Sequence, residues 1–600
     1  MKRFASLFLL PLSAAVCLAL AQTTAPASPN DHFILENNVA MPMRDGIVLR
    51  ADILRPPQGE GFPVLVYRTP YNKESALKDY EIFRKAVERG YAVVIQDVRG
   101  RYASEGGFVA YQNEGRDGFD TIEWAARQPW SNGSVGTFGL SYPGAVQWLA
   151  AIENPPHLKA MVPAMTFSTP RNFFYSGGVF DGSWLGWIWN NIAPDVRVRK
   201  NLLGPKTHEE AIAEWNRGRA RLQGYLPLSA LPDLKEIAPY YYEWMKHPAA
   251  DPWWNWCELR HKYANVHAAV LNLSGWYDEA YGPEGATTNF NGLMAARKGQ
   301  RELRTKTLIG PWVHGASATR ETKAGEREFG PAAAIDYDET VLRWMDHYLR
   351  GSDNGVDREK PVRIFVMGEN IWRDEEQWPP KRARATSFYL AAAEPGRKAA
   401  RLEPTIPGKN ARSSEFVSDP ANPVTDPYPA YSGAHDYREM EKRSDVLIFD
   451  SAPLEQDLEV TGQITAEIYL SCDAPDTDLW VRLLDVAPDG TAFNLMSPGL
   501  DVVRASYRNQ TNRRELLTPG RIYMLRLDQL RTSNVFKKGH RIRAQISTTF
   551  FPHFSRNLHT GELETVSAKM RAARISIYHD MQHPSRLILP AMPYGLLAGG

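Results

Sequence analysis

Strand-like and helix-like hydrophobic patterns alternate along the first part of the chain. "GIVLRADILRP" (46–56) alternates apolar and polar residues, whereas "FPVLVYRTPY" (62–71) and "YAVVIQDVRG" (91–100) are apolar runs that end in turn-forming residues. "FDTIEWAARQ" (119–128) has helical spacing, and "GSVGTFGLS" (133–141) returns to a strand pattern. Strands that alternate with helices predict an α/β unit with a mostly parallel sheet, covered by helices on both faces.

The strand pattern then fades and later returns. Residues 165–262 carry aromatic-rich helical segments such as "GSWLGWIWNN" (182–191), which predict a helical cap inserted into the α/β unit. Strand and helix patterns resume over 263–355 and close with the amphipathic helix "ETVLRWMDHYLRG" (339–351), for which the final glycine is a natural stop. The α/β unit is therefore expected in two parts, the first of which covers 34–164.

The last part of the chain has a different pattern of hydrophobic and polar residues. Residues 361–600 contain short segments with strict period-two alternation, such as "GQITAEIYLS" (462–471), separated by turn residues. This pattern predicts an all-β domain, an antiparallel sandwich of jelly-roll type.

The N-terminus has the features of a secretory signal peptide. A basic start (Lys2 and Arg3) precedes an apolar run and an A-L-A site that ends at Ala21. We expect residues 1–21 to be removed and the mature protein to be exported, either periplasmic or secreted. An uncleaved anchor is the alternative, although the apolar run is broken by Pro11 and is short for a membrane span.

Composition narrows the classes of partner. The 600 residues exceed one ordinary domain, and 70 Lys and Arg nearly balance 69 Asp and Glu. Without a basic excess, neither nucleic acid nor an anionic membrane surface is an expected partner. Cys17 leaves with the signal peptide, and Cys257 and Cys472 have no Cys or His at metal-ligand spacing, so we expect two buried thiols, with one disulfide as the alternative, and no metal. The sequence leaves a homo-oligomer open.

One serine stands out against this background. Ser141 lies in "GLSYPG" (139–144), directly after a predicted strand and before the helical pattern "AVQWLAAI" (145–152). A strand–turn–helix elbow exposes such a side chain at the sheet edge, and the neighbouring glycines avoid collisions in the tight turn. The pattern is G-x-S-x-x-G rather than G-x-S-x-G, because Pro143 occupies the position of the second glycine.

A nucleophilic serine needs a base and an acid that orients the base. Asp278 ends the strand pattern "AVLNLSGWYD" (269–278), and His314 ends "TLIGPWVHG" (307–315). Both lie at the carboxyl ends of predicted parallel strands, where open α/β sheets place their sites, and the order serine, acid, histidine is that of α/β-hydrolases. The alternatives are a turn aspartate and a loop histidine.

The chain resembles a known family along nearly its whole mature length. The matching stretches, in chain order, are "PMRDGIVLRADILRP", "RTPYNK", "GYAVVIQDVRGRYASEG", "GLSYPG", "GWYD", "IGPWVHG" and "SNVFKKGHRIRAQIS". They resemble the cocaine-esterase-type serine hydrolases, a family related to α-amino-acid ester hydrolases, glutaryl acylases and X-Pro dipeptidyl-peptidases. The resemblance implies an α/β-hydrolase domain, an inserted helical cap and a C-terminal jelly roll, and G-x-S-Y-x-G is that family's own elbow.

The resemblance also implies roles for individual residues. It makes Ser141 the nucleophile, Asp278 the acid and His314 the base of an acyl transfer that needs no cofactor. Tyr71 of "RTPYNK" would donate its hydroxyl to the oxyanion, together with the backbone N–H of Tyr142.

The substrate is less closely defined. The amino-acid ester hydrolases carry carboxylates for an α-amino group two and three residues after the triad acid, where this chain has Ala280 and Tyr281. Glu279 follows Asp278 by only one residue and does not match either position. The cap would supply a third acid, but this chain has Asn172 there. A buried ammonium without a counter-charge is unfavourable, which disfavours free α-amino acyl groups. Aromatic residues of the cap and beside the triad either shape a bulky or aromatic acyl pocket or simply pack: Phe173, Phe174, Tyr175, Trp184, Trp187, Trp189, Trp276 and Trp312.

Three functions follow in order of preference. The first is a serine esterase or amidase acting on small-molecule esters or amides. The second is an X-Pro dipeptidyl-peptidase, and the third is a non-catalytic protein that binds carbohydrate or another ligand through residues 361–600.

Overall fold

The structure is a computed structural model, which describes residues 33–170, 173–300, 302, 304–393, 399–409, 413–428, 432–497 and 499–593. The expected signal peptide (1–21), with Cys17, and Asn172 lie outside the described residues. Within those ranges, no helix is both long enough and apolar enough to cross a bilayer.

A ten-stranded sheet forms the centre of the described chain. Its strands, in spatial order, are β1 (Ile34–Pro42), β2 (Val48–Arg55), β4 (Ala92–Asp97), β3 (Phe62–Thr69), β5 (Ser131–Leu140), β6 (Leu158–Ala164), β9 (Ala269–Tyr277), β10 (Thr305–Val313), β13 (Val362–Val366) and β14 (Ile371–Glu375). Neighbours from β4 to β13 are parallel, and the pairs at both edges are antiparallel. The predicted parallel sheet is confirmed.

Helices cover both faces of this sheet, as the alternation of strands and helices predicts. In β3, Val64 and Val66 join a core with α3 and α4, whereas Leu65 and Tyr67 join a core with α2 and α10. The helices of this unit are α1 (Lys73–Asp79), α2 (Ile82–Glu88), α3 (Glu114–Ala126), α4 (Tyr142–Ala151), α9 (Gly282–Ala296) and α10 (Tyr337–Arg350). The predicted stop is also found, because Gly351 caps α10 in the left-handed conformation (φ 72°).

The cap lies between β6 and β9 in sequence. It contains the short strands β7 (Tyr175–Ser176) and β8 (Val179–Phe180) and the helices α5 (Ser183–Trp187), α6 (Ala193–Lys200), α7 (His208–Gly224) and α8 (Pro239–Trp244). A π-helical turn, Ile188–Ile192, joins α5 to α6. Buried aromatic residues of the cap belong to the same core as α3 and α4, so cap and sheet share one apolar interior.

The described residues after 383 form an all-β unit of fourteen strands. They are β15 (Arg384–Ala391), β16 (Ala400–Glu403), β17 (Ser414–Ser418), β18 (Leu447–Asp450), β19 (Leu458–Gln463), β20 (Thr465–Cys472), β21 (Asp478–Val486), β22 (Ala492–Asn494), β23 (Leu500–Arg504), β24 (Tyr523–Leu527), β25 (Arg531–Phe536), β26 (Arg541–Ser547), β27 (Ala573–Tyr578) and β28 (Arg586–Ala591). Two strands that follow residue 361, β13 and β14, extend the first sheet, because β13 pairs with β10 and β14 pairs with β13.

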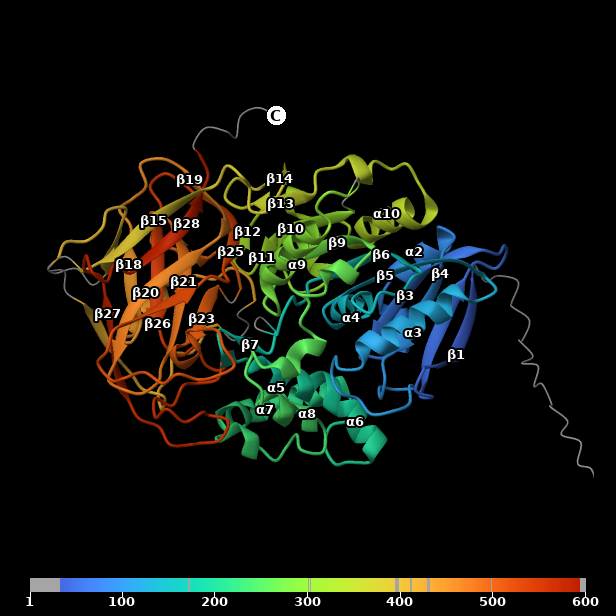
Figure 1. Cartoon of the computed structure of the whole chain (residues 1–600), viewed down its shortest axis with the longest axis horizontal. Helices are drawn as coiled ribbons and strands as arrows, with labels where there is room; N and C mark the ends of the chain where they lie inside the picture. The colour runs from blue at the N-terminus through green and yellow to red at the C-terminus, as the bar shows by residue number, and fades with distance from the viewer. Residues whose placement is uncertain are drawn as a thin grey trace, which may run out of the picture.

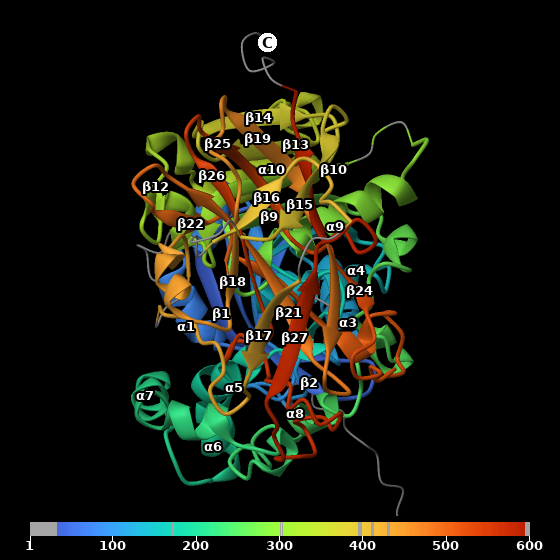
Figure 2. The same ribbon diagram turned by 90° about the vertical axis from the view of Figure 1, so that its left-hand side faces the viewer.

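The three units pack closely together. Figure 1 shows the C-terminal strands on one side, the parallel sheet on the other and the cap helices below both, and Figure 2 shows the cap again at the lower end. The Tyr277 hydroxyl donates to the Asn494 carbonyl (3.0 Å), and the Gly182 N–H donates to the His553 carbonyl (2.8 Å). The all-β unit therefore supports both the end of β9 and the cap. Cys472 in β20 and Cys257 in the cap are both buried and free, so the expectation of two buried thiols holds.

Candidate active site

Ser141 stands in a strained turn between β5 and α4. Its backbone has φ 67° and ψ −125°, and its N–H donates to the Ala164 carbonyl of β6 (3.0 Å). The flanking glycines are required by close approach. A Cβ on Gly139 (φ 137°) would lie 2.5 Å from the Pro143 Cβ, and one on Gly144 would lie 2.6 Å from the Ala164 oxygen. Backbone strain of this kind collects at functional sites, and here it holds a hydroxyl clear of the sheet.

The sheet brings Asp278 and His314 together. β9 and β10 are parallel neighbours whose last residues, Tyr277 and Val313, stand opposite each other. The next residue of each strand is therefore adjacent to its counterpart, and His314 Nδ1 and Asp278 Oδ1 are 2.8 Å apart. Asp278 is fully buried, and its Oδ1 also accepts the backbone N–H groups of Ala280 (3.1 Å) and Tyr281 (3.4 Å).

Two carboxylates set the charge at His314. Burial acts to lower the pKa of the imidazole, but Asp278 and Glu279 outweigh it, and the pKa is raised above its ordinary value. Glu279 Oε2 also accepts the backbone N–H of His314 (3.1 Å). Burial in turn raises the pKa of Glu279, against the attraction of His314. The two carboxylates thus stabilise the protonated imidazole of His314. A general base reaches this protonated state when it takes a proton during the reaction.

Tyr71 is held as a hydrogen-bond donor near Ser141. The Trp187 Nε1–H donates to the Tyr71 hydroxyl (3.0 Å), which leaves the tyrosine's own proton free. Burial raises the pKa of Tyr71 to about 12, and the Ser141 side chain is one of its hydrogen-bonding neighbours. The hydroxyl therefore stays protonated through the neutral range.

A buried arginine fixes the segment that carries Tyr71 to the cap. Arg101 Nε donates to the Pro70 carbonyl (2.9 Å), while its Nη atoms donate to the carbonyls of Ile192 (2.9 Å) and Asn191 (3.0 Å) in the π-helical turn. Trp187 directly precedes this turn. Arg101 therefore aligns the segment of Tyr71 with that of Trp187, whose indole N–H orients the Tyr71 hydroxyl.

Tyr142 follows the serine at the first position of α4. N–H groups in the first turn of a helix have no intrahelical acceptor, so its backbone N–H is available to a ligand, in the positive end of the helix dipole. Its side chain is buried behind the site, where the hydroxyl donates to Glu114 Oε1 (2.8 Å) and accepts the Tyr111 N–H (2.9 Å). Glu114 pairs with Arg68 at 2.8 Å, which anchors the start of α4.

Ser141 and His314 open into one cavity of about 650 Å³. Its walls combine aromatic rings with polar and charged residues, and the rings that line it are Tyr67, Tyr71, Tyr80, Phe138, Trp187 and Tyr337. Of these only Tyr71 and Trp187 are among the residues selected from the sequence. Tyr67 and Phe138 lie on strands that end at the site, but their pattern is that of ordinary core residues; Tyr80 and Tyr337 carry no signal in the sequence.

The other cap aromatics lie behind the cavity wall or away from it. Phe173 stacks on Phe167 and Tyr281, Phe174 stacks on Trp254, and Trp184 packs edge-on against Phe173. The Tyr175 hydroxyl donates to the Trp244 carbonyl (2.9 Å), and Trp189 packs under the Arg197 guanidinium. These side chains build the core of the cap. For them, the alternative of simple packing holds over the alternative of a substrate pocket.

Trp276 and Trp312 do not line the cavity. The indole N–H of Trp276 donates to the Phe365 carbonyl, and that of Trp312 donates to the Ala333 carbonyl, each at 2.8 Å. Both rings are buried, against Trp378 and Trp372 respectively. Proximity in sequence to Asp278 and His314 is misleading here, because these indoles turn into the packing around β13 and β14.

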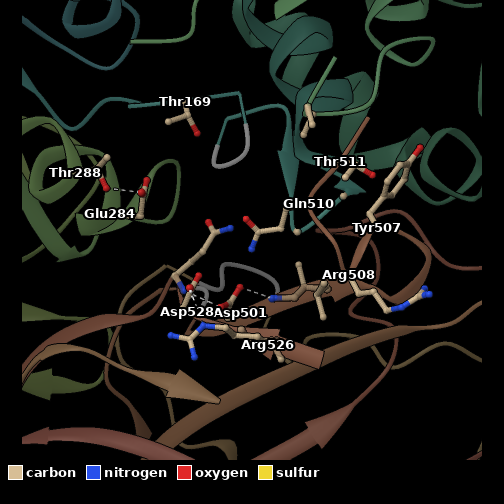
Figure 3. A pocket seen from close by; sticks show the side chains of 18 of the residues that line it. Thr169, Glu284, Thr288, Asp501, Tyr507, Arg508, Gln510, Thr511, Arg526 and Asp528 are labelled. Carbon is tan, nitrogen blue, oxygen red and sulfur yellow. Dashed lines mark hydrogen bonds and ion pairs between the residues drawn. The ribbon is translucent and has the colours of Figure 1, made fainter. Parts of the chain in front are cut away.

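A second cavity, of about 290 Å³, lies among α9, the cap and the C-terminal strands. Figure 3 shows Glu284 and Thr288 on one side of it and Asp501, Arg526 and Asp528 on the other. Its described lining contains no serine, cysteine or histidine. The ranges given above also contain no group of three or more residues placed to hold a metal ion. The cavity at Ser141 is therefore the candidate active site.

Comparisons with known proteins identify relatives that match most of the chain. The model of the X-Pro dipeptidyl-peptidase S15 family matches residues 45–316, and that of the X-Pro dipeptidyl-peptidase C-terminal non-catalytic domain matches residues 354–588. The cocaine esterase of Rhodococcus sp. (strain MB1 Bresler) is 32% identical over 590 residues, which cover 93% of this chain and 99% of the relative.

Two solved structures share the fold over nearly the whole chain. An α-amino acid ester hydrolase aligns with a TM-score of 0.80 at 24% identity and covers 96% of this chain and 100% of its own. An aminopeptidase of the marine sediment archaeon Thaumarchaeota archaeon aligns with a TM-score of 0.79 at 23% identity and covers 96% and 99%.

Proposed function

Since this chain belongs to the cocaine-esterase-type family of serine hydrolases, we propose that it hydrolyses carboxylic esters through an acyl-serine intermediate on Ser141. The observation that carries the proposal is the 2.8 Å hydrogen bond between His314 and the buried Asp278, next to a serine raised on a strained elbow in the same cavity. In this triad Ser141 is the nucleophile, His314 the base and Asp278 the acid that orients it.

The proton positions follow from the hydrogen bonds. Because His314 Nδ1–H donates to Asp278, Nε2 is the nitrogen left to take the proton of the Ser141 hydroxyl. As Oγ attacks the ester carbonyl, the carbonyl oxygen becomes an anion and accepts hydrogen bonds from the Tyr71 hydroxyl and the Tyr142 N–H. The C–O bond to the leaving alcohol then breaks, and the alcohol departs with the proton held on His314.

Water completes the cycle. His314, neutral again, takes a proton from a water molecule that attacks the acyl-serine carbonyl. The same two donors stabilise the second oxyanion. The Oγ–acyl bond breaks, Ser141 recovers its proton from His314, and the carboxylic acid leaves.

The cavity supports a bulky or aromatic substrate. The rings of Tyr67, Tyr80, Phe138 and Tyr337 line the cavity beside the nucleophile, which favours an aromatic or branched group over a short chain. The carboxylate next to the triad acid in sequence, Glu279, accepts the His314 backbone N–H and does not line the cavity. Ala280 and Tyr281, two and three residues after Asp278, carry no carboxylate. This favours esters over the peptides of an X-Pro dipeptidyl-peptidase, which need recognition of a free N-terminus.

The test is a panel of chromogenic substrates. We expect turnover of p-nitrophenyl butyrate and p-nitrophenyl benzoate, no turnover of Gly-Pro-p-nitroanilide, and no ester turnover by Ser141→Ala. Turnover of the Gly-Pro amide would instead support the dipeptidyl-peptidase. A folded wild-type protein that turns over none of them would contradict catalysis and favour a binding role for the all-β unit.

Residues 1–21 support a second, independent proposal, that the mature enzyme is exported. The basic start, the apolar run and the A-L-A site all lie in this segment. N-terminal sequencing of protein purified from the periplasm or medium should begin at Gln22; an intact Met1 on a membrane-bound chain would contradict cleavage.

A further inference from the structure

The chain leaves the sheet for the cap directly after β6, and this point contacts two of the segments that present the triad. The Ala164 carbonyl, at the end of β6, accepts the Ser141 N–H (3.0 Å). The next residue, Met165, donates its N–H to the Leu273 carbonyl (2.7 Å) in β9, the strand that Asp278 follows. The nucleophile and the strand of the acid are thus both bonded to the same pair of consecutive residues.

The side chain of Met165 makes the third contact, with the residue after the base. The Gly315 N–H donates to Met165 Sδ (3.3 Å). Met165 is fully buried and does not line the cavity at Ser141. Its sulfur therefore contacts the backbone of the turn that carries His314, and it does not contact a substrate in that cavity.

The turn at His314 is held from two sides. The His314 N–H donates to Glu279 Oε2 (3.1 Å), which follows β9, and the Gly315 N–H donates to Met165, which follows β6. Gly315 has a φ of 129°, and a Cβ built on it would meet only the Ser317 Oγ, at 3.8 Å. The turn thus has no side chain at this position to pack it in place. Hydrogen bonds to two consecutive N–H groups take over that task.

Met165 also has a strained backbone. Its φ is 42°, in the left-handed region that residues with a Cβ rarely adopt. Such a conformation persists only where the surrounding structure imposes it, and it is found most often at functional sites. A core methionine that only fills space needs neither this backbone nor an N–H donor on its sulfur.

We propose that Met165 is a positioning residue, whose thioether accepts the Gly315 N–H and thereby holds the His314 imidazole between Asp278 and Ser141. A thioether is a weak acceptor, so the contribution is one of alignment. The inference rests on the proposed function, because it takes His314 as the base. It requires the sulfur of the side chain and not merely its volume.

The experiment compares two methionine-to-leucine changes. Met165→Leu nearly conserves the apolar volume and the unbranched Cβ but removes the sulfur. Met161→Leu is the matched control: Met161 is equally buried in β6, but it belongs to the core on the face of α3 and α4, away from Gly315. Both variants and wild type are assayed with p-nitrophenyl butyrate for kcat, KM and the pH dependence of kcat/KM. Active sites are titrated with a fluorophosphonate, so that any misfolded fraction does not enter kcat.

We expect Met165→Leu to lower kcat per titrated site about three- to tenfold, as the loss of one neutral hydrogen bond implies, and to leave KM unchanged. The acid limb of kcat/KM should also move to lower pH. Asp278 and Glu279 raise the pKa of His314, and a displaced imidazole loses part of this stabilisation of its protonated form. Met161→Leu should change none of these values.

Two results would overturn the role of Met165. One is equal kcat losses in the two leucine variants. The other is a lower content of titrated sites with an unchanged kcat per site and an unmoved acid limb, which is the signature of a residue that only stabilises the fold. Wild type that folds but is not labelled by the fluorophosphonate would refute the proposed function, and the inference with it.

Discussion

Removal of the Tyr71 hydroxyl should slow turnover without weakening binding. In Tyr71→Phe the ring remains in the cavity wall, and the hydroxyl that donates to the developing oxyanion is lost. The wild-type hydroxyl is well prepared to donate, because Trp187 occupies its acceptor side at 3.0 Å and burial raises its pKa to about 12, so it is protonated at assay pH. A donor fixed in this way acts on the transition state more than on the bound ester.

The magnitude follows from the number of donors. With the Tyr142 N–H as the second donor, loss of one of two oxyanion contacts should reduce kcat about 100- to 1000-fold. Trp187→Phe keeps the Tyr71 hydroxyl and removes the N–H that orients it, together with part of a ring that lines the cavity. Its effect should be about tenfold or less, in line with one neutral hydrogen bond.

The assay is steady-state hydrolysis of p-nitrophenyl butyrate at pH 8, with kcat and KM determined for wild type and both variants. Thermal unfolding of each protein controls for global damage, because Tyr71→Phe leaves the Trp187 N–H without its acceptor. If kcat of Tyr71→Phe stays within twofold of wild type, or if Trp187→Phe is the more damaging change, Tyr71 is not the oxyanion donor.

Three further predictions test the surroundings of the triad and the fold. Glu279→Gln removes a carboxylate that raises the pKa of His314; the imidazole should then lose its proton at lower pH, and the acid limb of the kcat/KM profile should move to lower pH, whereas an unmoved limb would contradict the coupling. Gly144→Ala places a Cβ 2.6 Å from the Ala164 oxygen, whereas Gly107 has open space around it. In urea titrations Gly144→Ala should lose about 1–3 kcal/mol of unfolding free energy, and Gly107→Ala should not. Equal losses in the two variants would refute the steric account. Arg504→Ala leaves the carboxylates of Asp478 and Glu564, each at most 2% exposed, without their cation. This variant should lose about 3–5 kcal/mol of unfolding free energy in the same titration. An unchanged unfolding free energy would show that these acids are not ionised.

The sequence predicts the site best where local pattern and topology act together. Ser141, Asp278 and His314 follow strand patterns directly, and the parallel register of β9 and β10 is sufficient to bring the last two side chains into contact. The all-β texture of the C-terminal unit is equally local, because period-two alternation is visible within single strands.

Features that depend on tertiary packing could not be predicted in this way. β13 and β14 have the same alternation as the later strands, and only their pairing with β10 assigns them to the first sheet. Trp276 and Trp312 precede triad residues by two positions, yet their indoles bond to carbonyls of distant segments. Tyr80 lies between α1 and α2 and Tyr337 begins α10, so these two cavity residues are more than two hundred residues apart and no window of sequence relates them.

The central claim is that Ser141 is the nucleophile, and the most direct measurement is the site of covalent modification by a fluorophosphonate. Intact-mass analysis followed by peptide mapping of the folded protein should show one adduct per chain, on the peptide that contains Ser141. The adduct should be absent from Ser141→Ala and should form far more slowly in His314→Ala, which keeps the serine but loses its base. Absence of an adduct from folded wild type, or an adduct on another residue, would contradict the account.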